Sequence, residues 1–298
     1  MNRPAAWASS SASSCARSRV MPAWPAVAWN ACTAALRTAS ARPAARVSSF
    51  SAIRPEPYPA RRILGGVLAV ATVHLHPTAP LAERALLPGD PGRALALAQA
   101  LFDAPARMFN HNRGLWGYTG TATDGAPLTV QSTGIGGPSA AVVLEELCDL
   151  GLRCAIRVGT CTALDGRAAP GDLVAVREAL PADGTSRALG AQGPLGGDEA
   201  LTAALAVRAD RSGAVVSSDL FYDPRPGERA AWAAAGALAV DLETAAVLAV
   251  ARRRGIRAAA VLAVVARGDE RLGPEEIDEA GVRLGRAALE ALAPAPAA

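Results

Sequence analysis

The stretch VQSTGIGGPSAAVVLEEL, Val130 to Leu147, is the strongest indication of the fold in this sequence. It begins with a short apolar run, passes through three glycines, a proline and a serine, and ends in apolar residues spaced as on one face of a helix. A strand, a glycine turn and a helix in this order form the cradle that α/β folds place around phosphate groups or dinucleotides. The stretch therefore predicts an α/β fold with a site near the turn.

Two features argue against a dinucleotide at this turn. The glycines fall one position short of the pattern GxGxxG, because Ser139 stands where the last glycine is required. A dinucleotide site also needs an acidic residue at the end of the next strand, to bind the ribose hydroxyls. The next apolar run, CAIRVGTC, carries Arg157 and Thr160 instead. A cation and a hydroxyl suit an anion, so we do not expect NAD.

From Val67 onward the chain alternates between apolar runs typical of strands and amphipathic stretches typical of helices. We expect strands within 65–75, 84–87, 154–164, 171–180, 214–222 and 258–267, a hairpin over 117–133 that turns at 123–126, and helices from about 91 and over 139–151, 239–255 and 273–292. This alternation over residues 67–298 predicts one α/β domain.

Residues 1–66 differ in composition from the rest of the chain. They are rich in Ala, Ser, Arg and Pro, and they hold nine arginines and a single acid, Glu56. Such a segment buries too little apolar surface to offset the conformational entropy lost on ordering. We interpret 1–66 as a disordered extension or as the product of a wrongly assigned start codon. The net charge of +3 comes from this segment and does not indicate nucleic-acid binding.

Composition excludes several other classes of function. All 30 basic residues are arginine, which rules out a Schiff-base lysine and a P-loop lysine. The cysteines are odd in number and contain no CxxC pair, so reduced thiols in a cytoplasmic protein are expected; they are Cys15, Cys32, Cys148, Cys154 and Cys161. Three histidines without an HExxH motif argue against a metal site, and the apolar runs are too short to span a membrane.

Three arginines stand at predicted loops or within an apolar strand. Arg93 follows LLPGDPG at a predicted helix start, Arg113 lies in NHNRGLWGYTG, and Arg157 interrupts the apolar run AIRVGTC. A structural salt bridge would explain each of them alone. An arginine in an apolar strand needs a partner, and an oxyanion bound through two hydrogen bonds is a natural one. Together the three arginines favour a phosphate site.

These motifs carry a family resemblance. The sequence LLPGDPGR, then NHNRGLWGYTG, STGIGGPSAAVVLEEL, IRVGTC and AVDLETAA resembles the nucleoside phosphorylase family, which contains uridine phosphorylases and hexameric purine nucleoside phosphorylases. The resemblance runs from His74 to the C-terminus and has no counterpart for residues 1–66. It implies a single three-layer α/β domain with a mixed central sheet flanked by helices.

The resemblance also implies a reaction, phosphorolysis. Phosphate attacks the anomeric carbon of a nucleoside, and the base leaves through an oxocarbenium-like transition state, without a cofactor or metal. The residues at the family's phosphate-binding positions are Gly89, Arg93, Arg157 and Thr160, joined by Arg113 from a neighbouring subunit. Cations fixed in this way orient the nucleophile and stabilise the developing charge.

For the sugar, the family uses a Glu-Met-Glu run that here is Asp241-Leu242-Glu243. Glu243 matches the carboxylate that accepts two ribose hydroxyls, and Leu242 takes the place of the methionine beneath the sugar. Asp241 is shorter than the family's first glutamate, which puts its sugar contact in doubt. His74 matches a histidine lent to the 5′-hydroxyl in the neighbouring subunit.

The base decides between subfamilies. Purine enzymes carry an aspartate at the end of the late strand, but VVARGDERL has Arg267 there, as uridine enzymes do. Arginine does not donate a proton at neutral pH, but it stabilises the charge that develops on a departing uracil. Asp269 would serve as a purine acid only after a shift of the loop. Phe221 matches an aromatic near the base, and Arg229 remains from a base-reading motif whose glutamine is missing.

The main hypothesis is a cytoplasmic nucleoside phosphorylase, uridine-type first and purine-type second, in nucleoside salvage or catabolism. The alternatives are a nucleoside hydrolase and a non-catalytic nucleoside-binding protein of the same fold. Thr162 supports the last of these, because it replaces a family glycine and would be strained if that position needs a positive φ. A dimer or hexamer is expected, because His74 and Arg113 reach a site only across an interface.

Overall fold

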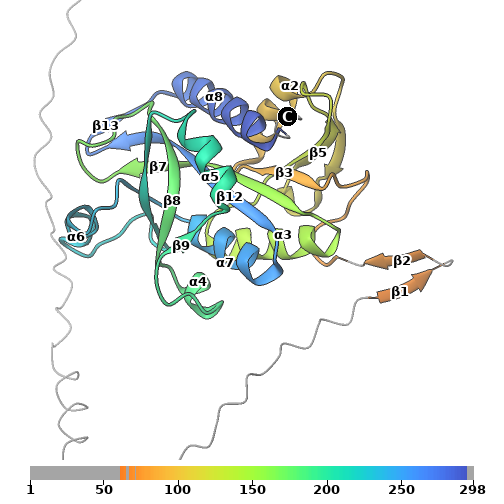
Figure 1. Cartoon of the computed structure of the whole chain (residues 1–298), viewed down its shortest axis with the longest axis horizontal. Coiled ribbons are helices and arrows are strands. Elements are labelled where there is room, and N and C mark those ends of the chain that lie inside the picture. Colours follow the sequence, from red (N-terminus) through yellow and green to blue (C-terminus); the bar gives the residue numbers. More distant parts are fainter. Residues whose placement is uncertain (1–60, 65–66, 71, 294–298) are drawn as a thin grey trace, which may run out of the picture. The chain divides into compact units, whose positions relative to one another are not determined.

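The computed structural model describes residues 61–64, 67–70 and 72–293 (Figure 1). Most of the segment expected to be disordered, residues 1–60, lies outside the described residues. Strands β1 (Arg61–Leu64) and β2 (Val67–Val70) pair antiparallel across the boundary we placed after residue 66. All described elements belong to one compact unit, Tyr58–Ala298.

The main sheet of the described chain has 11 strands, and parallel and antiparallel pairs are mixed in it. Its order is β13-β12-β8-β10-β11-β7-β3-β6-β5-β4, with β9 beside β8. The strands are β3 (Arg84–Leu87), β4 (Arg107–Asn110), β5 (Gly117–Thr121), β6 (Pro127–Gln131), β7 (Cys154–Ala163), β8 (Leu173–Ala182), β9 (Leu195–Gly196), β10 (Arg211–Ser218), β11 (Ala239–Asp241), β12 (Arg257–Arg267) and β13 (Glu270–Arg271). The mixed sheet confirms the expected fold class.

Strand β7 is the centre of this sheet. It pairs in parallel with β3 and β12, and its last residues pair antiparallel with β11. Because β12 also pairs with β8, the strands β7, β12, β8, β10 and β11 close a ring. The ring therefore brings Asp241 and Glu243, at and just after the end of β11, beside Arg157 of β7.

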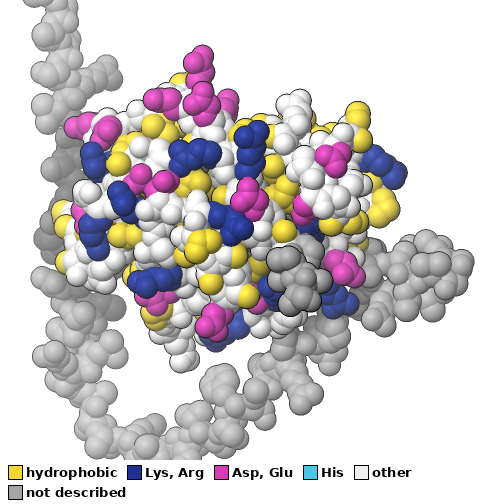
Figure 2. All heavy atoms as spheres, turned by 45° about the horizontal axis from the view of Figure 1, so that its top comes forward, with side chains coloured by type: hydrophobic (Ala, Val, Ile, Leu, Met, Phe, Trp, Pro, Cys, Tyr) yellow, Lys and Arg dark blue, Asp and Glu magenta, His cyan; other side chains and the backbone are white. Residues whose placement is uncertain are grey.

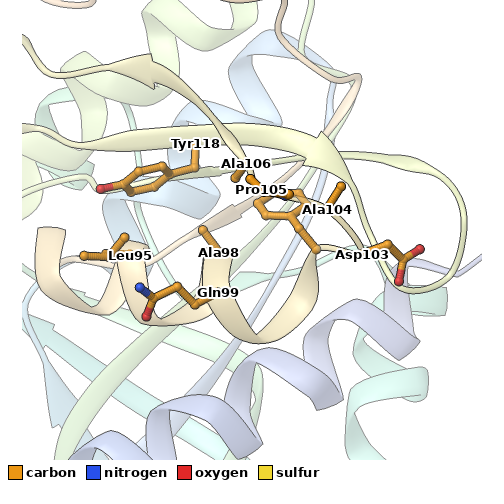
Figure 3. Close-up of a pocket in the computed structure, with 9 residues that line it drawn as sticks. Leu95, Ala98, Gln99, Asp103, Ala104, Pro105, Ala106 and Tyr118 are labelled. Atoms are coloured by element: carbon orange, nitrogen blue, oxygen red, sulfur yellow. The ribbon is translucent and has the colours of Figure 1, made fainter.

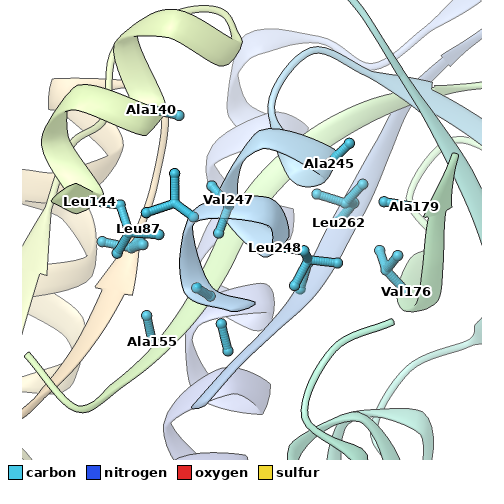
Figure 4. Packing of buried hydrophobic residues seen from close by; sticks show 14 of the residues in the cluster. Leu87, Ala140, Leu144, Ala155, Val176, Ala179, Ala245, Val247, Leu248 and Leu262 are labelled. Atoms are coloured by element: carbon cyan, nitrogen blue, oxygen red, sulfur yellow. The ribbon is translucent and has the colours of Figure 1, made fainter. Parts of the chain in front are cut away.

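Helices cover both faces of the sheet (Figure 1). Helices α2 (Pro91–Leu101), α5 (Glu199–Ala206) and α8 (Pro274–Leu292) lie together on one face. Helices α3 (Gly137–Asp149), α4 (Gly184–Ala188) and α7 (Thr244–Arg254) lie on the other. Each face has its own apolar core, and Figure 4 shows α7 packed through Val247 and Leu248 against α3 and the sheet. This is the expected three-layer arrangement.

The helix ends follow from local sequence. Helix α2 begins where Asp90 accepts a hydrogen bond from the Arg93 backbone N–H at 2.6 Å, with Pro91 in the first turn. Helix α7 ends in three arginines and Gly255, whose φ of 67° stops the helix.

Two sequence predictions need correction. The helix expected over 239–255 begins only at Thr244, because Ala239–Asp241 forms β11 between β10 and β7. The apolar run expected as a strand within 65–75 contributes only β2, which pairs with β1 and not with the main sheet. In both places sheet pairing, which periodicity does not reveal, decides the outcome.

On the face that Figure 2 shows, arginine and acidic side chains are interspersed. Within the described ranges, no helix combines the length and apolar character that crossing a membrane requires. The three cysteines of the described part are free thiols, and burial raises the pKa of Cys148 to about 12.

We predict opposite effects for two glycines of α8. A Cβ at Gly285 would lie 2.2 Å from Leu97 Cδ2 of α2, so Gly285→Ala forces the two helices apart and lowers stability by about 1–3 kcal/mol. A Cβ at Gly281 has ordinary contacts at 3.5 Å from Arg93 Cδ, so Gly281→Ala gains helix propensity, about 1 kcal/mol. Chemical denaturation measures both; equal effects of the two substitutions would contradict this packing.

Candidate functional site

Two loops meet beside Arg157 at one edge of the sheet. Strands β3, β6 and β7 run parallel, and Leu87, the last residue of β3, is paired with Arg157. The loops after β3 and β6 are joined by hydrogen bonds from Thr133 N to Pro88 O at 2.8 Å and from Gly134 N to Gly89 O at 3.0 Å. The carboxyl ends of parallel strands are where α/β folds bind ligands. The predicted Gly89, Arg157 and glycine turn thus lie together.

Arg157 is the most deeply buried cation of this edge, with 2% of its surface exposed. Its side chain runs along β7 toward the carboxyl end of the strand, and a Cβ on Gly159 would lie 2.6 Å from Nη2. Glycine is therefore required at 159 to admit the guanidinium. The Nε atom donates to Asp241 Oδ2 and to Thr244 Oγ1, both at 3.1 Å, and Nη2 donates to Glu243 Oε2 at 2.5 Å.

Asp241 acts as a structural partner of Arg157. Its Oδ2 also lies 3.0 Å from Arg157 Nη2 and accepts from Thr244 N and Oγ1, and its Oδ1 accepts from Ser217 Oγ at 2.6 Å. With only 3% of its surface exposed, Asp241 is enclosed by these partners. The Asp241 carboxylate is therefore occupied by Arg157, which agrees with our doubt that this shorter acid contacts the sugar.

Glu243 links Arg157 to the glycine turn. Its Oε1 accepts from Gly136 N at 2.6 Å, and its Oε2 accepts from Arg157. Gly136 has φ 88°, a conformation that side-chain-bearing residues rarely adopt, so the turn presents its N–H to Glu243 only with glycine there. Leu242, between the two acids, is half-buried.

One guanidinium donor has no protein partner. Arg157 Nη1 is buried and makes no hydrogen bond to the described residues. Although burial opposes it, Glu243 and Asp241 raise the pKa of Arg157, so the group is charged. A buried, charged donor without a partner is costly, and an anion would satisfy it.

Arg93 lies close enough to add a second cation. It is half-buried in the first turn of α2, where backbone N–H groups and the helix dipole favour an anion. Burial and the charge of Arg157 hold the pKa of Arg93 below its ordinary value, while Asp90 and Glu243 oppose the shift. Thr160, three residues beyond Arg157 on β7, is half-buried.

Thr162 is not strained. Arg113 is the one non-glycine residue with positive φ in the described part of the chain. Thr162 lies in β7 and pairs with Val240 of β11. The position is ordinary extended backbone, so the strain that a family glycine led us to consider does not arise.

His74 and Arg113 lie on two loops that are joined to each other, and we call this pair of loops the ridge. Asn112 Nδ2 donates to His74 O at 2.8 Å, which ties the loop before β3 to the short helix η1 (Asn112–Gly114). Arg113 is exposed, and its φ of 58° is sparsely populated for residues other than glycine. Glu146 of α3 holds the His74 segment through several hydrogen bonds.

The predicted base-contacting residues are at least partly exposed and lie on different elements. Phe221 is 54% exposed and lies edge-on to Tyr222, with ring centroids 4.9 Å apart. Arg229 is exposed on α6 (Glu228–Ala234). Arg267 ends β12 beside Ala163 of β7 and pairs with Glu270 at 2.7 Å. None of these contacts joins the three side chains to one another.

A cavity elsewhere on the domain takes no part in this site. It measures about 410 Å³ and lies between α2, the segment 102–106 and Tyr118 of β5, and Gln99, Asp103 and Tyr118 supply its polar groups (Figure 3). The described residues contain no His, Cys, Asp or Glu group suited to hold a metal ion.

Sequence reasoning missed four residues that build the site: Asp241 as the partner of Arg157, Ser217, Thr244 and Glu146. The pairing of Asp241 with Arg157 could have been predicted from the sequence. A buried arginine needs a carboxylate, and AVDLETAA is an apolar run that contains two acids. The roles of Ser217 and Glu146 depend on contacts between distant segments.

The chain is similar to known enzymes over this region. Residues 83–294 match the Phosphorylase superfamily. A guanosine phosphorylase of Halorubrum lacusprofundi is 37% identical over 189 residues, which are 61% of this chain and 77% of that protein. A DeoD-type purine nucleoside phosphorylase of Geobacillus kaustophilus is 35% identical over 63% and 82% of the two chains.

Uridine enzymes are similar as well. A uridine phosphorylase of Salmonella typhimurium is 32% identical over 207 residues, which cover 62% of this chain and 80% of that protein. The crystal structure of a uridine phosphorylase from Vibrio fischeri superposes with a TM-score of 0.65 at 26% identity, over 71% of this chain and 91% of that chain. Relatives of both base classes therefore share this fold.

We predict that Gly159→Ala displaces the Arg157 guanidinium, because the added Cβ would meet Nη2 at 2.6 Å. Stability should fall by about 1–3 kcal/mol, the usual cost of overpacking. Gly166→Ala is the matched control, because no atom lies within 4 Å of its added Cβ and its φ is not positive. Thermal unfolding measures both; a Gly159→Ala protein as stable as the Gly166→Ala protein would contradict the position of Arg157.

Proposed function

The chain belongs to the phosphorylase superfamily, and from this membership we propose that it is a nucleoside phosphorylase. Inorganic phosphate attacks the anomeric carbon of the nucleoside as the bond to the base breaks. The products are a free base and a pentose 1-phosphate, so the enzyme is a pentosyltransferase of nucleoside salvage or catabolism. No cofactor enters this reaction, and we place the enzyme in the cytoplasm, where its thiols stay reduced.

The observation that carries this proposal is the unpartnered Nη1 of Arg157. Phosphate bound to it would also face Arg93 and the Gly89 backbone, with Thr160 and a partner's Arg113 completing the set. Burial and the charge of Arg157 lower the pKa of Arg93, and an anion between the two guanidinium groups would relieve their repulsion. The same charges hold phosphate in line with the anomeric carbon.

Glu243 is the proposed sugar ligand. Its two oxygens have about four lone-pair sites, of which Gly136 N–H and Arg157 Nη2 use two. The remaining sites suit two vicinal hydroxyls of a ribose, with Leu242 beneath the ring. Because Glu243 also contacts Arg157, sugar and phosphate would be held by adjacent atoms of one ion-pair cluster.

For the base we favour a pyrimidine. Arg267 stands at the end of β12, where its permanent charge would stabilise a departing uracil anion. Phe221 and Arg229 would close over the base from the loop before α6. A purine is the second candidate, because the guanosine and DeoD-type relatives are 37% and 35% identical to the chain. Asp269 would then supply the proton.

We further propose that two copies complete each other's sites, as a dimer or as dimers in a hexamer. Exposed apolar side chains occur on the ridge, in the glycine turn and on α3: Val73 and Trp116, Ile135, and Val142. Burying such side chains favours association. His74 and Arg113 would then reach the neighbour's sugar and phosphate.

The experiment that tests the function follows base release from uridine, inosine and guanosine, with phosphate or with chloride at the same ionic strength. We expect release from uridine only when phosphate is present, with formation of ribose 1-phosphate. Release in chloride would identify a hydrolase, and no release from any of the three nucleosides would favour a binding protein. Release from the purine nucleosides alone would select the second candidate.

Arg267→Ala tests the role assigned to this arginine. Removing the charge should lower kcat/KM for uridine by about 10²-fold, as loss of one group stabilising a developing anion typically does. The matched control is Asp269→Asn, two residues along the same loop, which should leave uridine cleavage unchanged. The opposite result would be that Asp269→Asn alone loses activity, and that the lost activity is cleavage of inosine or guanosine. It would identify Asp269 as the proton donor of a purine enzyme.

A further inference from the structure

A half-buried carboxylate, Glu146 of α3, organises the ridge that carries His74. Its side chain is 12% exposed and accepts three consecutive backbone N–H groups. Val73 N and His74 N donate to Oε1 at 3.1 and 2.9 Å, and Leu75 N donates to Oε2 at 2.7 Å. The loop before β3 is thus wound around one carboxylate.

The same carboxylate contacts the imidazole. His74 Nδ1 lies 2.7 Å from Glu146 Oε1. Although burial opposes it, the hydrogen bonds from Leu75 and His74 hold the pKa of Glu146 below its ordinary value. An ionised carboxylate only accepts hydrogen bonds, so the proton between the two groups belongs to Nδ1. In the neutral ring Nε2 then carries a lone pair and is an acceptor.

A second set of contacts fixes the other side of the loop. Asn110 is fully buried, its Oδ1 accepts from His76 N at 2.8 Å, and its Nδ2 donates to Leu115 O. Asn112 Nδ2 donates to His74 O at 2.8 Å. These bonds hold both the His74 segment and the turn in which Arg113 has its positive φ. Such a conformation persists where its surroundings determine it, and it is typical of functional positions.

We propose that Glu146 is a positioning residue, which holds His74 as the Nδ1–H tautomer so that Nε2 accepts a hydrogen bond from the 5′-hydroxyl of a nucleoside in the neighbouring copy. This inference rests on the proposed function. A 5′-hydroxyl donates to Nε2, whereas a 5′-phosphate ionised at neutral pH offers acceptors and is repelled by the nearby Glu146 charge. The Glu146–His74 pair therefore favours nucleosides over nucleotides.

The test compares Glu146→Gln with Glu145→Gln. The amide of Glu146→Gln has one acceptor oxygen, so its NH2 group must face a backbone N–H or His74 Nδ1. Glu145, the preceding residue of α3, pairs with Arg254 at 2.7 Å and is the matched control. Two-dimensional ¹H–¹⁵N spectra that detect imidazole nitrogens report the tautomer, and the chain has only three histidines to assign.

We expect the Nδ1–H tautomer for His74 in the wild type and in Glu145→Gln, and its loss in Glu146→Gln. The preference for uridine over 5′-deoxyuridine, or for inosine over 5′-deoxyinosine, should fall roughly three- to tenfold in Glu146→Gln, as for one lost hydrogen bond. His74→Ala should remove the same preference.

Two results would overturn the inference. One is an Nε2–H tautomer of His74 in the wild type, which requires no variant to fold. The other is an unchanged 5′-hydroxyl preference in a folded Glu146→Gln protein. If neither nucleoside is cleaved by the wild type, the proposed function fails, and the wild-type spectrum still decides whether Glu146 sets the tautomer.

Discussion

The ion pair of Arg157 with Asp241 and Glu243 is the interaction on which the site depends. A guanidinium at the centre of a sheet is expensive to bury unless its charge and its donors are matched. Here Gly159 makes room for it, two acids at the end of β11 balance its charge, and Ser217 and Thr244 bind one of those acids. The ring of strands brings these segments together.

This cluster also explains why the glycine turn matters. The turn that resembles a dinucleotide loop donates its Gly136 N–H to Glu243 and not to a phosphate of its own. We propose that the anion binds instead at Arg157 Nη1, on β7, and at Arg93 of α2. The residues proposed to bind sugar and phosphate, Glu243 and Arg157, are thus in direct contact. His74 and Arg113 lie on the ridge, which we propose faces a second copy of the chain.

Much of this was predictable from the sequence, because it is local. Alternating apolar runs, Pro91 at a helix start and Gly255 at a helix end gave the order of most elements. The family motifs brought Gly89, Arg157 and Glu243 into one hypothesis, and the structure places these three at one edge of the sheet. What escaped prediction is non-local: the three-residue strand β11, the closure through β12, and the carboxylate of Glu146 beneath a loop 71 to 73 residues earlier.

The most direct test of the central claim is a crystal structure of the protein with arsenate in place of phosphate. Anomalous scattering locates the arsenic atom. We predict one strong arsenic site per chain within hydrogen-bonding reach of Arg157 Nη1, the Arg93 guanidinium and Gly89 N. An arsenic site elsewhere, or a fully occupied water on Nη1 at saturating arsenate, would contradict the assignment of this buried arginine as the phosphate ligand.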